Sequence, residues 1–418
     1  MKKTNQKEYR YVIIGNSAAA IGTVEGIRKI DREGAIAVVS TENHHTYSRP
    51  LISYLLEGKT DRGRMLYRAP DFYEKNQCET YFGKTAVALD PGAHAVTLDD
   101  GTVLRYEKIM ISAGSEAFVP PFQGLETVGR KYSFMTLDDA LELEEALSPE
   151  QKVLILGAGL IGLKCCEGIA RRVQSVTVVD LSPRILSSIL NEKAAAIVQK
   201  HIERQNVSFR LGQTVRQFRG NSAVLDNGEE LVFDLLVLAV GVRPRTALIK
   251  EAGGACGRGI LTDAYQKTSL EDVYAAGDCT ESYDISAEQS RILALLPNAY
   301  RQGEAAGINM AGGCLAFGQA IPMNAIGFFG LHLLTAGTYL GETYEKEDDK
   351  NYKILYHKDN LLKGYILLGN VEKAGIYTSL IREKIPLDTI DFELICEKPG
   401  LMAFSQKYRS QKLGGLQS

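Results

Sequence analysis

A strand–turn–helix–strand pattern that occurs twice constrains the fold of this chain more than any other feature. Each copy has an apolar run of strand length, a turn of small residues, a helical stretch and a second apolar run. The copies lie at residues 9–39 and 152–180. Two β-α-β units of this length, each opening its helix with small residues, predict an α/β protein with two Rossmann-like dinucleotide-binding folds.

The turn of the second copy has a complete glycine pattern. A pyrophosphate binds at a helix N-terminus, where unpaired N–H groups and the helix dipole favour negative charge and side chains beyond Cβ would block its approach. Asp180, which ends the next strand, would accept hydrogen bonds from ribose hydroxyls and repel a 2′-phosphate. This favours NADH over NADPH, although Arg184 nearby weakens the preference. The expected contacts are Gly157, Gly159, Leu160, Ile161, Gly162 and Asp180.

The turn of the first copy is degenerate, because Ser17 and Ala20 replace the second and third glycines. Every side chain through this turn is nevertheless small, which a plain loop would not require. Far along the chain, an apolar segment ends in Gly277-Asp278. A carboxylate at that edge of a sheet can bind a ribityl hydroxyl of FAD, and Glu42 at the end of the second strand is a candidate ribose acceptor.

Composition narrows the class of protein. A chain of 418 residues is long enough for two or three domains. The formal net charge of -3 shows no basic stripe for nucleic acid, and no apolar run is long enough for a signal peptide or a membrane span. We therefore expect a cytoplasmic protein without nucleic-acid or membrane partners. The seven cysteines form no C-x-x-C pair or metal-ligand cluster, so we expect no metal site and buried thiols.

The order of the segments predicts an inserted domain. The two pairs Pro120-Pro121 and Arg243-Pro244 mark the expected crossings between the folds. The last eighteen residues carry basic side chains and no acid, so we expect a frayed tail that could also steer an acidic partner. The predicted parts are an FAD-binding domain at 1–117 and 245–313, an NAD(H)-binding domain at 118–244, a small α+β interface domain at 314–395 and a tail at 396–418.

Four motifs in this order resemble the two-dinucleotide-binding flavoprotein oxidoreductases related to glutathione reductase. They are Gly15–Ala20, Ile111–Ser115, Gly157–Gly162 and Gly277-Asp278, and Leu238–Pro244 resembles the strand that returns beside the nicotinamide in that family. The resemblance spans residues 9–312 and implies FAD and NADH as cofactors. It implies FAD contacts from Gly15, Ser17, Ala18, Ala19, Glu42, Arg49, Pro50, Ala86, Ala113, Gly114, Gly277, Asp278 and Asn298, and an NAD contact from Gly241.

The helix after the first unit decides the branch of the family. Thiol-dependent members carry a redox-active cysteine there, whereas residues 44–53 of this chain contain none. The stretch from Tyr47 to Ser53 is similar to rubredoxin and ferredoxin reductases and to the flavin module of assimilatory nitrite reductase. Further matches at 297–303, 321–324 and 362–369 resemble the NADH:rubredoxin reductase type and extend the likeness to about residue 390. No iron–sulfur or siroheme cysteines follow.

One departure from the family concerns catalysis. Relatives place a lysine and a glutamate, paired near flavin N5, where this chain has Tyr54 and Lys164. We expect Lys164 to lie beside the isoalloxazine, where its charge would favour reduced flavin. The alternative is that Lys164 turns outward into solvent.

The resemblance implies an enzyme that passes electrons from NADH through FAD to a rubredoxin, a ferredoxin-like protein or an iron–sulfur subunit. Four alternatives stay open: the NADH-oxidising flavin subunit of a larger iron–sulfur or metalloenzyme complex, an NADH oxidase, a disulfide reductase and a flavin-bound redox sensor. The missing cysteine disfavours the disulfide reductase. A homo-oligomer also stays open.

Overall fold

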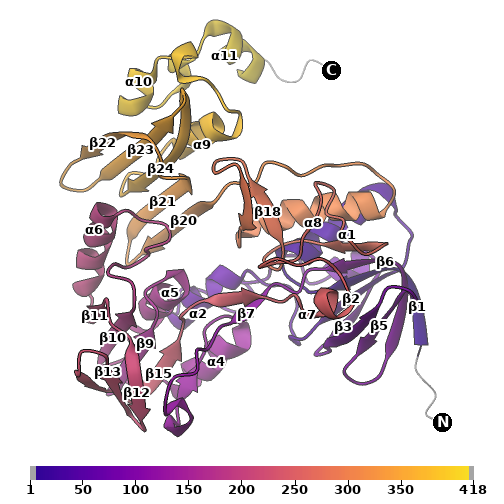
Figure 1. The fold of residues 1–418 in the computed structure, drawn as a ribbon, viewed down its shortest axis with the longest axis horizontal. Helices are drawn as coiled ribbons and strands as arrows, with labels where there is room; N and C mark the ends of the chain where they lie inside the picture. The colour runs from indigo at the N-terminus through magenta and orange to yellow at the C-terminus, as the bar shows by residue number, and fades with distance from the viewer. Residues whose placement is uncertain (1–5, 414–418) are drawn as a thin grey trace. The chain divides into compact units, whose positions relative to one another are not determined.

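The computed structural model describes residues 6–413, with side chains to residue 410, and divides into two compact units. Unit 1 comprises Met1–Pro183, Gln205–Tyr283 and Ser290–Ala320, and unit 2 comprises Arg184–Arg204, Asp284–Gln289 and Ile321–Ser418. Unit 1 holds both copies of the repeat seen in the sequence (Figure 1).

The first copy builds a seven-stranded sheet in the order β3-β2-β1-β6-β5-β4, with β17 paired to β6. Strands β1, β2, β3 and β17 run parallel to their neighbours, whereas β4, β5 and β6 form an antiparallel meander. A tight turn at residues 99–102 joins β5 to β6. The strands are β1 (Gln6–Ile14), β2 (Ile36–Ser40), β3 (Cys78–Phe82), β4 (Ala86–Asp90), β5 (Ala95–Leu98), β6 (Val103–Ile111) and β17 (Val273–Ala275).

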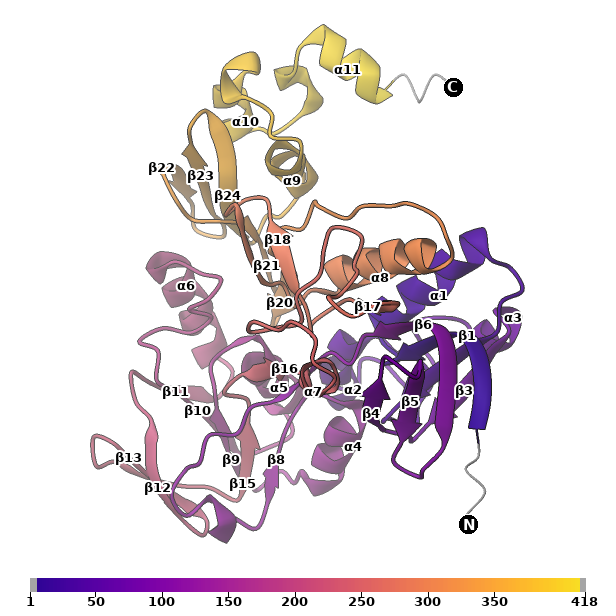
Figure 2. The ribbon, with the colours of Figure 1, turned by 45° about the vertical axis from the view of Figure 1, so that its right-hand side comes forward.

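Two long helices of unit 1, α1 (Ala18–Ile30) and α8 (Leu296–Met310), pack against each other along their length (Figures 1 and 2). Glycines make this approach close. A Cβ on Gly22 would lie 2.2 Å from the carbonyl oxygen of Tyr300, and one on Gly303 would lie 2.0 Å from that of Ala19. The crossing therefore fixes the start of α1, where the first small-residue turn lies.

The second copy builds a five-stranded parallel sheet in the order β11-β10-β9-β15-β8. Its strands are β8 (Lys131–Tyr132), β9 (Lys152–Leu156), β10 (Ser175–Asp180), β11 (Val207–Leu211) and β15 (Leu235–Leu238). Its helices in unit 1 are α4 (Leu137–Ala146) and α5 (Leu160–Ile169). The meander β12 (Val215–Arg219), β13 (Ser222–Leu225) and β14 (Glu230–Val232) and the crossing pair β7 (Ser115–Ala117) and β16 (Val242–Pro244) complete this part.

The two copies repeat each other down to single hydrogen bonds. The N–H of Gly15 donates to Val39 O and the N–H of Gly157 donates to Val179 O, both at 2.8 Å. A Cβ on either glycine would lie 2.2 Å from a backbone carbonyl oxygen of the strand on the other side, and both have a positive φ. Only glycine fits these turns, because a side chain would be strained and would clash.

Unit 2 contains the antiparallel sheet β20-β21-β24-β23-β22. Its core gathers buried residues such as Leu355, Tyr365, Tyr377 and Leu380. Its elements are α6 (Glu192–Glu203), β20 (Met323–Phe328), β21 (Leu331–Gly337), β22 (Glu342–Glu347), β23 (Tyr352–Lys358), β24 (Leu361–Leu368), α9 (Ala374–Arg382), α10 (Phe392–Glu397) and α11 (Gln406–Leu413). The α/β class with two Rossmann-like folds and a C-terminal α+β part is thus confirmed.

The remaining elements are short. They are α2 (Ile52–Leu56), α3 (Phe72–Lys75), α7 (Ala247–Glu251), β18 (Glu281–Asp284) and β19 (Gln289–Ile292), with 3₁₀ turns η1 (Arg49–Leu51), η2 (Leu125–Thr127), η3 (Leu387–Thr389) and η4 (Leu401–Ala403).

The expected tail needs a correction. Residues 396–404 are ordered against the sheet of unit 2, and Cys396, Ala403 and Phe404 are buried in its core. Burial of Ala403 and Phe404 holds the start of the last eighteen residues in place, so the expectation of a frayed end is wrong at residues 401–404, whereas the predicted boundary at residue 396 stays a prediction. Residues 414–418 lie outside the described residues. The other domain boundaries stay predictions.

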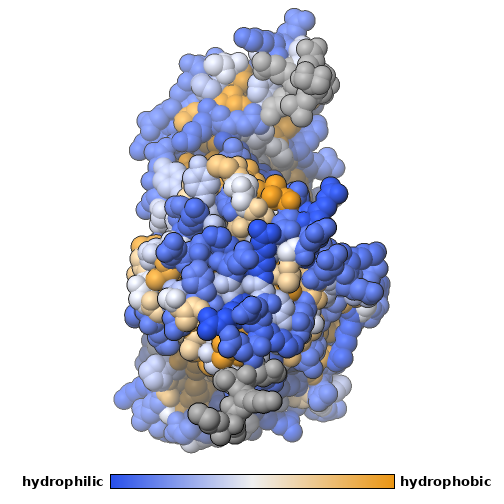
Figure 3. All heavy atoms as spheres, turned by 90° about the vertical axis from the view of Figure 1, so that its right-hand side faces the viewer, coloured by the Kyte–Doolittle hydropathy of each residue, from blue (hydrophilic) through white to orange (hydrophobic). Residues whose placement is uncertain are grey.

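One face of the molecule is mostly polar at its surface. The face drawn in Figure 3 is largely hydrophilic, with apolar residues in small separate areas. Between residues 6 and 413, no helix has the length and apolar content to cross a bilayer.

Candidate functional site

The helices that follow the two glycine turns begin without a side-chain cap. Neither Ser17 at the start of α1 nor Gly159 at the start of α5 caps its helix, and neither helix has an acid in its first turn. By contrast, Thr136 caps α4 and Asn191 caps α6. The first N–H groups of α1 and α5 thus stay available to an anion at the carboxyl ends of parallel strands.

In the second fold, the turn and the acid at the end of β10 lie together. The Asp180 carboxylate accepts hydrogen bonds from the backbone N–H groups of Ala158 at 2.6 Å and Ser182 at 2.7 Å. A Cβ on Gly162 would lie 2.0 Å from the carbonyl oxygen of Gly157, which fixes helix against turn. Gly159 and Gly241 have open space where a Cβ would stand. Leu160 and Ile161 form the first turn of α5. These residues fit a nicotinamide dinucleotide.

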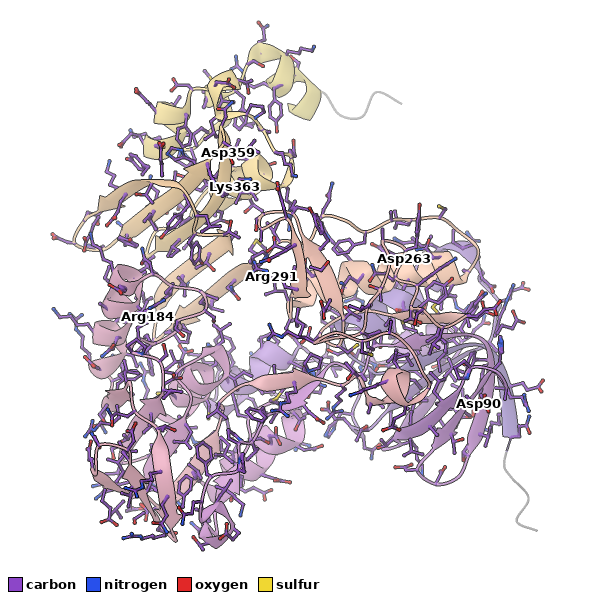
Figure 4. All side chains as sticks on the ribbon, viewed as in Figure 1. Asp90, Arg184, Asp263, Arg291, Asp359 and Lys363 are labelled. Atoms are coloured by element: carbon purple, nitrogen blue, oxygen red, sulfur yellow. The ribbon has the colours of Figure 1, made fainter. Side chains whose placement is uncertain are left out.

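Arg184 lies in unit 2 (Figure 4). Its guanidinium donates to the carbonyl oxygens of Leu190 and Ser187, both at 3.4 Å. The arginine is thus already engaged with the backbone of its own unit.

In the first fold, a charged group follows the end of β2. Arg49 donates to the Glu42 carboxylate, to the Tyr47 hydroxyl at 3.2 Å and to the carbonyl oxygen of Met135 at 3.0 Å. Burial lowers the pKa of Arg49, but Tyr47, Glu42 and Asp278 outweigh it and raise the pKa overall. Glu42 therefore stands as an anchored carboxylate two residues after β2.

Asp278 follows β17 at the carboxyl edge of the first sheet. Burial raises the pKa of its carboxyl group, and Arg49 offsets part of that shift. Its neighbour Gly277 has a φ of 84° and donates its N–H to Gln302 Oε1 at 2.9 Å. Within residues 6–413 the Asp278 carboxylate makes no hydrogen bond, so a hydroxyl donor of FAD fits it.

The remaining predicted FAD contacts lie on several elements. Ala18 and Ala19 are buried at the start of α1, and Asn298 is buried in the first turn of α8. Pro50 lies in η1, Ala86 begins β4 and pairs with Leu98, and Ala113 and Gly114 follow β6. Gly114 has a φ of 68° and open space at its Cβ position. Their contacts with FAD stay predictions.

Lys164 and Tyr54 meet where the two folds pack together through α5 and α2. The Lys164 ammonium lies 4.7 Å from the centre of the Tyr54 ring and pairs with Glu167. Only 17% of the Lys164 side chain and 5% of the Glu167 side chain are exposed. Lys164 therefore does not turn outward into solvent, and the alternative weighed from the sequence is wrong. Its position beside the flavin stays a prediction.

Two residues that lie beside Asp180 belong to no motif that the sequence shows. The N–H of Gln213 donates to Asp180 O at 3.1 Å, and Gln213 Oε1 is buried with no hydrogen-bond partner in the part of the chain that the structure describes. Leu181 is 70% exposed, although it is apolar. An unpaired buried amide oxygen and an exposed leucine at the end of β10 suit the adenine half of a dinucleotide.

None of the cysteines forms a disulfide. Cys165, Cys166 and Cys279 are fully buried, and burial raises the pKa of Cys279 to about 12. The Cys279 thiol points to the carbonyl oxygens of Ala276 at 3.4 Å and Ile111 at 3.6 Å. Among the described residues, no group of three His, Cys, Asp or Glu side chains could hold a metal ion.

Comparison with known families agrees with this geometry. The model of the pyridine nucleotide-disulphide oxidoreductases matches residues 9–303, and the chain belongs to that family. It is an NAD(P)H-dependent flavin oxidoreductase with FAD and NADH as its cofactors.

Individual relatives narrow the kind of oxidoreductase. The chain is 31% identical over 90% of its length, and 92% of the relative's, to the epsilon subunit of NADH-dependent phenylglyoxylate dehydrogenase from Aromatoleum evansii. It is 28% identical to rubredoxin-NAD(+) reductase from Pseudomonas putida over 72% of this chain and 80% of that one. Among solved structures, putidaredoxin reductase in covalent complex with putidaredoxin matches with a TM-score of 0.86 at 20% identity, covering 93% and 96% of the two chains.

Proposed function

We propose that this protein takes electrons from NADH and passes them through FAD, one at a time, to an iron–sulfur or rubredoxin-type protein. The observation that carries the proposal is an arrangement that recurs in both sheets: a glycine turn leads into a helix without a side-chain cap, and an anchored carboxylate stands at or just after the end of the next parallel strand. Bound flavin and nicotinamide would supply the hydride transfer and the change from two-electron to one-electron chemistry.

The residues of the chain would bind and orient the cofactors. Backbone N–H groups at the starts of α1 and α5 would hold the two pyrophosphates. Glu42 and Asp180 would accept hydrogen bonds from the two adenosine riboses. Asp278 would accept a hydrogen bond from the ribityl chain.

Lys164 would act where the two folds meet. Its ammonium is shielded from water between Tyr54 and Glu167. A cation held in such a place stabilises negative charge more than one in water does. We propose that it favours the reduced flavin, with Tyr54 and Glu167 fixing its position.

Direct exit of electrons is supported by the state of the thiols. The segment that carries the redox cysteine in thiol-dependent relatives forms η1 and α2 here, and it contains no cysteine. The buried thiol nearest to Asp278 in the chain is Cys279, whose raised pKa keeps it protonated at neutral pH. A thiol relay therefore has no candidate in this segment.

Anaerobic NADH oxidation with a panel of acceptors tests the proposal. The acceptors are rubredoxin, several ferredoxins, glutathione disulfide and a viologen dye. We expect turnover with at least one iron protein and none with the disulfide. NADH that fails to bleach the bound flavin, or turnover with the disulfide alone, would show that the proposal is wrong.

A second candidate is favoured by one specific finding. The relative from Aromatoleum evansii, which this chain matches over 92% of the relative's length, is named as a subunit of a dehydrogenase. Under this second hypothesis the chain is the NADH-oxidising subunit of a larger complex. Affinity purification from the native host under anaerobic conditions distinguishes the two, because a subunit co-purifies in fixed ratio with an iron–sulfur protein whereas a free reductase does not.

A further inference from the structure

Tyr47 links the charged group of the first fold to a helix of the second. Its hydroxyl donates to Glu42 Oε2 at 2.6 Å, and it accepts from the N–H of Leu137 at 2.9 Å and from Arg49 Nη1 at 3.2 Å. A phenol oxygen has one hydrogen and two lone pairs, so these three bonds use its full capacity. Tyr47 is 8% exposed, which excludes most water from the group.

The directions of these bonds are fixed by chemistry. An ionised carboxylate accepts only, so Tyr47 must be the donor toward Glu42. Burial raises the pKa of Tyr47, and Glu42 adds to that shift against the opposing effect of Arg49, so the hydroxyl keeps its proton. Both lone pairs then face Leu137 and Arg49.

The partner across the fold boundary is the start of α4. Leu137 is the first residue of that helix, and an N–H at this position has no acceptor within its own helix. The capping box of Thr136 and Asp139 satisfies the N–H groups of those two residues and not that of Leu137. The Leu137 N–H therefore depends on the Tyr47 hydroxyl.

Two further contacts join the start of α4 to the loop that carries Tyr47. Arg49 donates to the carbonyl oxygen of Met135 at 3.0 Å, and His44 Nε2 lies 2.6 Å from Asp138 Oδ1. The helix continues from β8, an edge strand of the second sheet. Residues 44–49 thus hold the second fold at one point, and Glu42 lies beside that point.

We propose that Tyr47 is a positioning residue that couples occupancy of the FAD site to the fastening of the second fold. The inference rests on the proposed binding of FAD. A ribose bound to Glu42 restricts that carboxylate, the carboxylate holds the Tyr47 hydroxyl, and the hydroxyl holds the Leu137 N–H. FAD should thereby steady the start of α4 although α4 itself need not touch it.

The rate of hydrogen exchange at the Leu137 amide measures this coupling. We expect removal of FAD from the wild-type holoenzyme to speed exchange in the peptide 135–140 by about two- to tenfold, the range for one hydrogen bond. In Tyr47→Phe the exchange should be fast with and without FAD. FAD should also dissociate from this variant about three- to tenfold more readily.

Tyr106→Phe is the matched control, because Tyr106 is 4% exposed in the same unit and its hydroxyl has no hydrogen-bond partner among the described residues. This variant should keep the FAD-dependent exchange of wild type. The coupling would be refuted if FAD left exchange at 135–140 unchanged or faster in wild type, or slowed it equally in Tyr47→Phe. The comparison of wild-type protein with and without FAD tests the coupling even if Tyr47→Phe does not fold. Failure of the chain to bind FAD would instead refute the proposed function.

Discussion

Replacing Gly303 by alanine should weaken FAD binding, because the added methyl group would displace the start of α1. Gly303 lies on α8, and a Cβ there would stand 2.0 Å from the carbonyl oxygen of Ala19 and 2.9 Å from its Cα. Ala19 belongs to the first turn of α1, whose N–H groups are predicted to hold the pyrophosphate. The methyl group would therefore push directly on the proposed phosphate site.

The magnitude follows from the contact. Non-bonded carbon and oxygen atoms need more than 3 Å, so α1 and α8 must separate by about 1 Å or more. Overpacking of this kind costs about 1–3 kcal/mol, and because the obstacle is backbone on both sides we place the cost at the upper end. Alanine returns about 1 kcal/mol through its better helix propensity. The net loss of about 2 kcal/mol corresponds to roughly 4–8 °C in the melting of a domain of this size.

Flavin fluorescence during heating measures the effect, because released FAD is bright. We expect Gly303→Ala to release FAD about 4–8 °C below wild type. Gly375→Ala is the matched control, since Gly375 lies in helix α9 with no atom within 4 Å of its Cβ position. That variant should melt at or above the wild-type temperature. Equal release temperatures for Gly303→Ala and wild type would refute the argument from close packing.

Three further predictions concern the proposed site. Lys164→Ala should lower the flavin midpoint potential by about 30 mV, equivalent to a tenfold change for a two-electron couple. Lys59→Ala, whose ammonium lies 5.8 Å from the centre of the Tyr54 ring, should leave the potential unchanged. Redox titration against a reference dye checks both variants, and an unshifted potential in Lys164→Ala contradicts the role of the cation. Asp180→Ala should raise the KM for NADH about tenfold or more and reduce the ratio of kcat/KM for NADH to kcat/KM for NADPH. Steady-state kinetics with both nucleotides measures these changes, and an unchanged KM for NADH would count against Asp180 as the ribose acceptor. Iodoacetamide at pH 8 should label the exposed Cys314 and leave Cys279 unlabelled, because burial raises the pKa of Cys279 to about 12. Peptide mass spectrometry measures the labelling of each cysteine, and faster labelling of Cys279 than of Cys314 would contradict this prediction.

The fold was largely predictable because the repeat is local. In each copy a turn that begins with glycine follows the first apolar run and an acid ends or follows the second, and the structure places Gly15 and Gly157 in matching hydrogen bonds. The ordered end of the chain was not predictable from its basic composition. Cys396 and Phe404 are held by burial against residues far away in the sequence, which a local pattern does not record.

The site was predictable only in part, for a similar reason. Glu42 and Asp180 follow strands, so their places at a sheet edge could be read from the chain. The tie from Tyr47 to Leu137 joins residues 90 positions apart, and no spacing rule connects them. Lys164 could be assigned to α5, but its contact with Tyr54 depends on how α5 meets α2.

The starts of α1 and α5, the two helices proposed to bind the pyrophosphates, lack the side-chain caps found elsewhere in the chain. A serine, threonine, asparagine or aspartate cap stabilises a helix by about 1 kcal/mol, and the chain uses such caps at α4, α6 and α10. It places a serine before α1 as well, yet that side chain makes no capping bond. At α5 the residue is glycine, which has no side chain to give. An acid in either first turn would favour the helix dipole but repel a pyrophosphate, and neither helix has one. On the proposed function, an anion bound at either start would offset the missing cap, so FAD and NADH should each stabilise the fold that binds it.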